Sequence, residues 1–115
     1  MPTVVRLAEY KTAAKGIQPD IFFDKKEFDQ LLSIYSPRVM SGEWKNYAIR
    51  HDPTMAAFLI FRTNSSQPSF TIVKRKLIGS KPEFVVYRGR ARMKQSGSLS
   101  EALSVLKQKL KLVNI

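Results

Sequence analysis

Several residue types that carry chemistry are missing or scarce in this sequence. It has no cysteine, which excludes disulfides, thiolate zinc sites, cysteine-held iron–sulfur clusters and cysteine nucleophiles. Its five glycines stand apart from one another, so none of them belongs to a phosphate-binding loop. With a single histidine, His51, and scattered acidic residues, it offers no metal-ligand pattern. We therefore expect no cofactor and no metal site.

Long apolar segments are also absent. The longest uninterrupted apolar run, residues 55–61, is far short of the roughly 20 residues that cross a bilayer. Residues 1–16 lack the apolar stretch of a secretory signal, and the presence of Glu9 and the absence of serine argue against a transit peptide. We therefore expect a cytoplasmic protein without a membrane partner. Residues 1–20 should form a flexible N-terminal arm, and residues 21–115 a single domain.

Acidic residues are few, and their scarcity is uneven along the chain. The 115 residues include 20 Lys and Arg but only 9 Asp and Glu, which gives a net charge of +11. Residues 1–61 contribute only +1, whereas residues 62–115 contribute +10 and hold just two acidic side chains, Glu83 and Glu101. An excess of this size is most simply explained by a polyanionic partner that binds the C-terminal half.

Two segments have the pattern of amphipathic helices. Asp24 and Glu27 form a capping box, and an apolar residue recurs at helical spacing from Phe28 to Tyr35. Pro37 should interrupt this helix, and we favour a restart that continues to Gly42. A second helix should open at Ser98, with Glu101 completing its capping box. Its apolar stripe is Leu99, Leu103, Leu106 and Leu110.

Between these helices the apolar pattern changes to a period of two. Four strands are expected, over residues 44–50, 55–62, 69–77 and 83–94, with polar or Gly- and Pro-containing turns between them. The order of elements is α-β-β-β-β-α. It predicts a single-domain α+β fold, in which a four-stranded antiparallel sheet has helices packed on one face.

A row of basic residues in the expected fourth strand carries the functional hypothesis. Arg88, Arg90, Arg92 and Lys94 alternate with other residues, so in one strand all four would project from the same face. Their spacing resembles that of phosphates along an extended nucleic-acid strand. A plainer interpretation is that the row only keeps the sheet edge from pairing with other chains.

Other residues extend this candidate surface. Lys74 and Lys76 share a face of the expected third strand, and a hairpin would bring them near the basic row. Phe84 and Tyr47 are candidate stacking residues on an open sheet face. Trp44, the only tryptophan, is interpreted either as a core residue or as a contact for a partner.

From these features we expect a non-enzymatic module that binds DNA or RNA with low sequence specificity, as a single strand or through the backbone. The alternative is an adaptor that binds an acidic protein partner. A homodimer is compatible with both hypotheses, by analogy with sheet-based single-strand binders. Catalysis by His51 and Asp52 is not favoured, because Asp before proline is also explained by a turn.

Three segments resemble a known family. They are IFFDKKEF over residues 21–28, GEWKNYAI over residues 42–49 and LKQKLKLV over residues 106–113. They resemble a family of small alphaproteobacterial proteins classed only as a domain of unknown function. The resemblance covers about residues 21–113 and implies a bacterial, cytoplasmic protein with one domain. It implies no activity and no catalytic residue.

Overall fold

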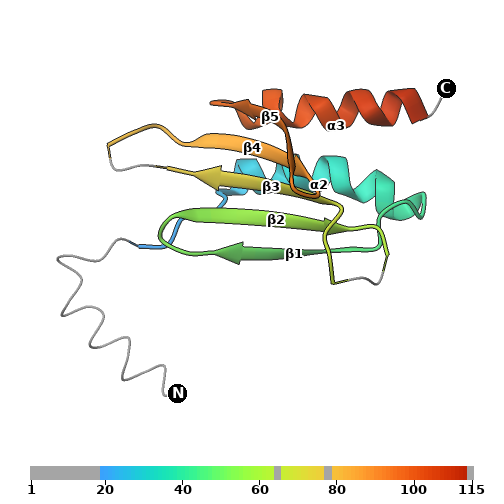
Figure 1. The fold of residues 1–115 in the computed structure, drawn as a ribbon, viewed down its shortest axis with the longest axis horizontal. Helices are drawn as coiled ribbons and strands as arrows, with labels where there is room; N and C mark the ends of the chain where they lie inside the picture. Colours follow the sequence, from blue (N-terminus) through green and yellow to red (C-terminus); the bar gives the residue numbers. More distant parts are fainter. Residues whose placement is uncertain (1–18, 64–65, 77–78, 114–115) are drawn as a thin grey trace, which may run out of the picture.

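A computed structural model describes residues 19–63, 66–76 and 79–113, with the side chains of the last helix described as far as Lys107. Its elements, in chain order, are α2 (Lys25–Met40), β1 (Asn46–His51), β2 (Met55–Phe61), β3 (Phe70–Arg75), β4 (Glu83–Arg88), β5 (Ala91–Ser96) and α3 (Leu99–Val113). Figure 1 shows the strands side by side, with the described chain starting beside the end of β1. No described helix is long and apolar enough to span a bilayer.

The sheet is an antiparallel meander of five strands in the order β1-β2-β3-β4-β5. The predicted α+β class is therefore confirmed, but the predicted number of four strands is wrong. Residues 83–94 are not one strand, because the chain turns at Gly89 and Arg90 and returns as β5.

Helix α2 begins as predicted. The carboxylate of Asp24 accepts the Glu27 N–H at 2.8 Å, and Glu27 accepts the Asp24 N–H at 2.8 Å, which completes the capping box. The predicted interruption at Pro37 is wrong, since the helix runs on to Met40. Pro37 lies in the last turn and costs the helix one backbone hydrogen bond, that to the carbonyl four residues earlier, while its own carbonyl still accepts the Ser41 N–H at 3.0 Å.

Helix α3 has only half of its predicted capping box. The Glu101 N–H donates to the Ser98 hydroxyl at 3.3 Å, but the Glu101 carboxylate accepts the Ser96 hydroxyl at 2.6 Å instead of the Ser98 N–H. Leu99, Leu103 and Leu106 are buried as the apolar stripe requires. The fourth member of that stripe lies beyond the described side chains.

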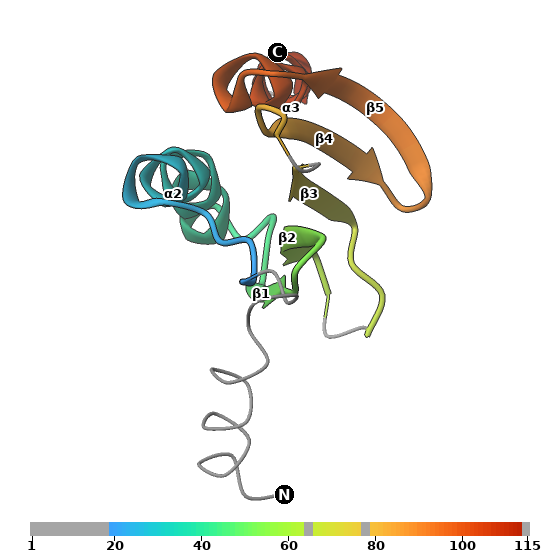
Figure 2. The ribbon, with the colours of Figure 1, turned by 90° about the vertical axis from the view of Figure 1, so that its left-hand side faces the viewer.

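Both helices lie on the same side of the sheet (Figure 2). We call this side the helix-side face. The core lies there, where Phe58, Ile72 and Val86 of the sheet are buried in one apolar cluster with Leu31 of α2 and Leu103 of α3. We call the opposite side the open face. Because opposed residues of neighbouring strands point the same way, the register assigns Ala48, Leu59, Thr71, Tyr87 and Arg92 to one row across the open face.

Candidate nucleic-acid interface

The β4–β5 hairpin determines where the basic residues of the C-terminal half point. Arg88 pairs with Ala91, which leaves Gly89 and Arg90 as a two-residue loop. Gly89 has φ of 60°, as in the Gly-X loops that suit the twist of a hairpin, and its N–H donates to the Ser69 carbonyl at 3.1 Å. The hairpin is therefore held against the start of β3.

The predicted row of basic residues on one face is wrong. Arg88 opposes Phe70 on the helix-side face, whereas Arg92 opposes Tyr87 on the open face. Lys94 opposes Val86 and returns to the helix-side face, because a register shift between Val86 and Tyr87 inserts an extra residue in β5. Arg90 lies in the loop itself. The alternation in sequence continues through a turn and a bulge, and each of them changes which way the side chains point.

The predicted contribution of Lys74 and Lys76 is also wrong in its geometry. The Lys74 ammonium lies 2.7 Å from Glu27 and 2.8 Å from the Phe22 carbonyl, so it ties β3 to the start of α2. Lys76 is exposed but follows the end of β3. Both lie at the opposite end of the sheet from the β4–β5 loop, since Phe84 near the start of β4 opposes Lys74.

The three aromatic candidates do not line an open surface. Phe84 is 3% exposed and Trp44 is 1% exposed, so both belong to the core, as the plainer interpretation of Trp44 expects. Tyr47 is 38% exposed, but it lies on the helix-side face, where its ring stacks on Phe58 with centroids 4.8 Å apart.

Five basic residues belong instead to one end of the sheet, the end at which β1 begins, which lies at the right of Figure 1. In an antiparallel meander the starts of odd strands and the ends of even strands meet at the same end, and here that end holds Arg88 at the end of β4, Arg92 near the start of β5, and Arg62 and Arg90 in the adjoining loops. We call this region the basic end. It comprises Lys45, Arg62, Arg88, Arg90 and Arg92, all of them exposed.

The basic end has no acidic counterpart in the described chain. Every described carboxylate has a partner elsewhere, and the closest acidic residue in sequence, Glu43, pairs with Arg38 at 3.3 Å. The other pairs are Asp20 with His51, Asp24 with the Glu27 N–H, Glu27 with Lys74, Asp29 with Lys25, Asp52 with Thr54, Glu83 with Arg75 and Glu101 with Ser96. No residue of the basic end forms an ion pair with a described residue.

Two aromatic side chains of the open face lie next to the basic end. Tyr87 stands beside Arg92 in the row already described, and Phe61 lies on β2 two residues beyond Leu59, opposite Asn46. Both rings are partly exposed. Residues 83–88 do alternate between the two faces, but the sequence pattern predicts Phe84 on the open face, whereas the structure places Tyr87 there.

A chain of polar contacts holds Arg92 in this position. Its Nη1 donates to Gln95 at 2.8 Å, Gln95 donates to Glu83 at 3.2 Å, and Glu83 accepts Arg75 Nε at 2.6 Å. By register these residues and Tyr87 surround Val85, which is fully buried although no described helix covers the open face. Long side chains therefore build a firm, partly apolar surface beside the basic end.

A comparison with protein families places this domain. The model of a family described as "Protein of unknown function (DUF2794)" matches residues 21–103. The chain belongs to the DUF2794 family. The expected resemblance to a domain of unknown function is thereby confirmed. No curated protein and no solved structure matches the sequence.

The match to DUF2794 contains both candidate surfaces. It begins at Ile21, just before α2, and ends at Leu103 within α3, so that the whole sheet, the basic end and the open face fall inside it. It leaves out the predicted N-terminal arm, which up to residue 18 is also outside the described residues.

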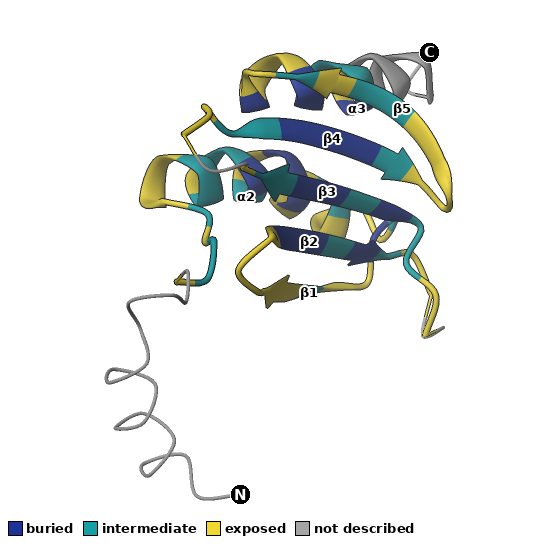
Figure 3. Cartoon of the chain, turned by 60° about the vertical axis from the view of Figure 1, so that its left-hand side comes forward, coloured by how far each residue is buried: buried dark blue, intermediate teal, exposed yellow. Residues whose placement is uncertain are grey.

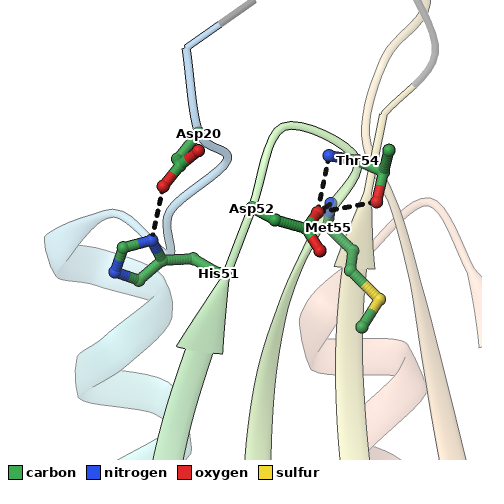
Figure 4. A network of polar contacts seen from close by, with 5 residues as sticks. All are labelled: Asp20, His51, Asp52, Thr54 and Met55. Atoms are coloured by element: carbon green, nitrogen blue, oxygen red, sulfur yellow. Dashed lines mark hydrogen bonds and ion pairs between the residues drawn. The ribbon is translucent and has the colours of Figure 1, made fainter. Parts of the chain in front are cut away.

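The far end of this DUF2794 domain holds His51 and Asp52, drawn in Figure 4. The two side chains do not act together: His51 Nδ1 contacts Asp20 at 2.9 Å, while one oxygen of Asp52 accepts the Thr54 N–H, the Thr54 hydroxyl and the Met55 N–H at 2.6–2.9 Å. These hydrogen bonds, first that of the Thr54 side chain, lower the pKa of Asp52. Asp52 therefore caps a turn. Among the described residues no group of His and carboxylate side chains could hold a metal ion.

Proposed function

We propose that this domain is a non-enzymatic module that binds single-stranded nucleic acid with little sequence preference. Phosphates contact the basic end, and unpaired bases stack on the open face. The observation that carries the proposal is the segregation of charge: the arginines of the basic end have no acidic partner among the described residues, while each described carboxylate is used elsewhere.

The size of the basic end suits several phosphates at once. Neighbouring strands lie about 4.8 Å apart, so Lys45 at the start of β1 and Arg92 on β5 are separated by about 19 Å across the sheet. A surface that required only solubility would mix charges of both signs. Cations without acidic partners instead release counterions from a bound polyanion, and binding then falls steeply with salt.

The open face favours a single strand over a duplex. Tyr87 and Phe61 offer ring faces on a sheet that no described helix covers. Bases in a duplex are already stacked on each other, whereas unpaired bases gain about 1–3 kcal/mol from each aromatic contact. The guanidinium of Arg92 beside Tyr87 is suitably placed for the phosphate that accompanies such a base.

The proposal is tested by fluorescence anisotropy with labelled polythymidine, polyuridine and a duplex over a range of salt concentrations. We expect the triple variant Arg88→Gln, Arg90→Gln, Arg92→Gln to bind the single strands more weakly. Its slope of log affinity against log salt should be shallower by about 2, since each phosphate contact contributes about 0.7. The control variant Lys26→Gln, Lys76→Gln, Lys81→Gln removes the same charge from exposed residues outside the basic end.

Equal losses in the two triple variants would mean that net charge alone drives binding, and would overturn the proposed site. An acidic protein partner is the competing explanation of the basic end. It predicts that polyglutamate binds as tightly as polythymidine and that substitution of Tyr87 has no effect on either.

A further inference from the structure

The two edges of the sheet differ in how they are protected. The β5 edge carries a register shift, Arg92 and Lys94, and α3 packs against it. These are devices that keep an edge from pairing with another chain. The β1 edge has no proline and no bulge, and all but one of its residues are exposed. Among the described residues nothing pairs with its outer side.

Exposed apolar side chains concentrate around this β1 edge. Tyr47 is 38% exposed and Ile49 is 42% exposed, and both lie on the helix-side face of β1. Two other large exposed apolar residues flank the end of β1: Phe22, whose ring lies against that of His51, and Met55 at the start of β2; Val39 and Met40, also exposed, belong instead to the last turn of α2. Figure 3 shows β1 as an exposed strand at the edge of the sheet. Such a patch marks an interaction surface.

We propose that a second copy of this chain pairs with β1 in antiparallel orientation, about a two-fold axis that passes through Ala48. The end of β1 is already covered, because Asp20 contacts His51 at 2.9 Å and the Phe22 ring lies 4.2 Å from the His51 ring. The uncovered stretch is residues 46–50, and its midpoint is Ala48. A two-fold axis normal to the sheet places the helix-side faces of both copies on the same side of the combined sheet. Residues of the same face therefore oppose each other across the two β1 strands.

The backbone and the side chains fit this register. The Asp52 N–H donates to Met55 at 2.9 Å, so alternation along β1 directs the backbone groups of Tyr47 and Ile49 outward, where a second strand can bond them. Tyr47 then opposes the partner's Ile49, and this aromatic and β-branched pair occurs twice. Arg50 opposes the partner's Asn46, so no like charges meet. Pairing with β5 would instead bring basic residues together.

The dimer also completes the nucleic-acid interface, a consequence that rests on the proposed function. Asn46 opposes Phe61 on the open face. With Arg50 of one copy opposite the partner's Asn46, that guanidinium is added to the partner's basic end. Each copy therefore supplies a cation to the other copy's site.

Cysteine cross-linking tests the register, since the chain has no cysteine of its own. Opposed residues of a non-hydrogen-bonded pair have Cα atoms about 4.5 Å apart, within the range of a disulfide. Mild oxidation of Ala48→Cys in the full chain, without nucleic acid, should convert most of it to a covalent dimer. Gln95→Cys on the β5 edge is the control and should stay monomeric. Cross-linking of Gln95→Cys but not of Ala48→Cys overturns the proposal.

Sedimentation velocity tests the association itself. The wild-type chain should sediment as a dimer, and Ile49→Lys should halve the mass while its circular dichroism is unchanged. Met40→Lys replaces an even more exposed apolar residue, 87% exposed, away from the edge and should remain dimeric. A wild-type monomer, or an Ile49→Lys dimer, overturns the proposal. Separately, Arg50→Gln should weaken polythymidine binding severalfold in the dimer and not in the Ile49→Lys monomer. An absence of binding by any variant would contradict the proposed function and leave the dimer measurements standing.

Discussion

The two ends of the sheet both carry basic side chains, but among the described residues only one of them holds basic side chains of its strands in ion pairs with carboxylates. At the end near His51, Lys74 and Arg75 are bound to Glu27 and Glu83 at 2.7 Å and 2.6 Å. We call this the paired end. At the basic end no side chain has an acidic partner within the described residues. The difference separates charge that holds the fold together from charge that is available to a ligand, which net charge alone does not do.

The largest effect on stability is expected at the paired end. Glu27 and Lys74 are only 14% and 13% exposed, and Glu27 also completes the cap of α2. Glu27→Gln leaves a largely buried ammonium without its counter-ion and should lower the free energy of unfolding by about 3 kcal/mol. Urea denaturation measures this change.

Two other variants serve as comparisons for the loss of stability expected from Glu27→Gln. Asp29→Asn breaks an ion pair whose side chains are 60% and 89% exposed, and should cost less than about 0.5 kcal/mol. The triple glutamine variant of the basic end should lose little stability, because it removes like charges that have no acidic partner and gives up only the exposed hydrogen bond from Arg92 to Gln95. Comparable destabilisation by all three variants would show that the two ends do not differ as described.

The next largest effect is expected on nucleic-acid binding, and it compares an aromatic residue beside the basic end with one at the paired end. Tyr87→Leu keeps an apolar cover over Val85 but removes the ring, and should weaken polythymidine binding about tenfold with little change for a duplex. Phe22→Leu removes an aromatic side chain that is 55% exposed at the paired end, and should leave both affinities unchanged. Fluorescence anisotropy measures the two affinities. Parallel losses in the two variants would argue against stacking on the open face.

A smaller loss of stability is expected from substitution of Gly89 in the β4–β5 loop. A Cβ at Gly89 would meet no atom within 4 Å, so Gly89→Ala adds only the strain of a side chain at φ of 60°. That strain should cost about 1 kcal/mol in thermal or urea unfolding, and Gly89→Asn should cost less because asparagine tolerates this conformation. Gly97→Ala also has open space but no positive φ, and serves as the control. A cost as large for Gly97→Ala would remove the special role of the Gly89 turn.

The same loop shows what sequence patterns could and could not predict. The cap of α2 was predictable because Asp24 and Glu27 satisfy each other locally. The β4–β5 turn could not be predicted, because Gly89 fits the alternating pattern of residues 83–94. Neither a two-residue loop nor a bulge interrupts that alternation in the sequence. Without the turn, strict alternation places all four basic residues on one face, which is the expectation that the structure contradicts. The basic end depends on which strand ends meet in space, and alternation within one strand does not contain that information.

The smallest expected change in the free energy of unfolding concerns Asp52 at the paired end and depends on pH. Hydrogen bonds from Thr54 and Met55 lower the pKa of Asp52 below its ordinary value of 3.8, so the folded state favours the charged carboxylate. Its contribution to stability is fully present above about pH 4 and is lost as the pH falls through the lowered pKa of the folded state. The difference in unfolding free energy between the wild type and Asp52→Asn should therefore shrink below pH 4. The basic end has no carboxylate, so its triple glutamine variant should differ from the wild type by the same amount across this range. A wild-type advantage over Asp52→Asn that persisted unchanged into strong acid would show that the carboxylate's charge does not stabilise this turn.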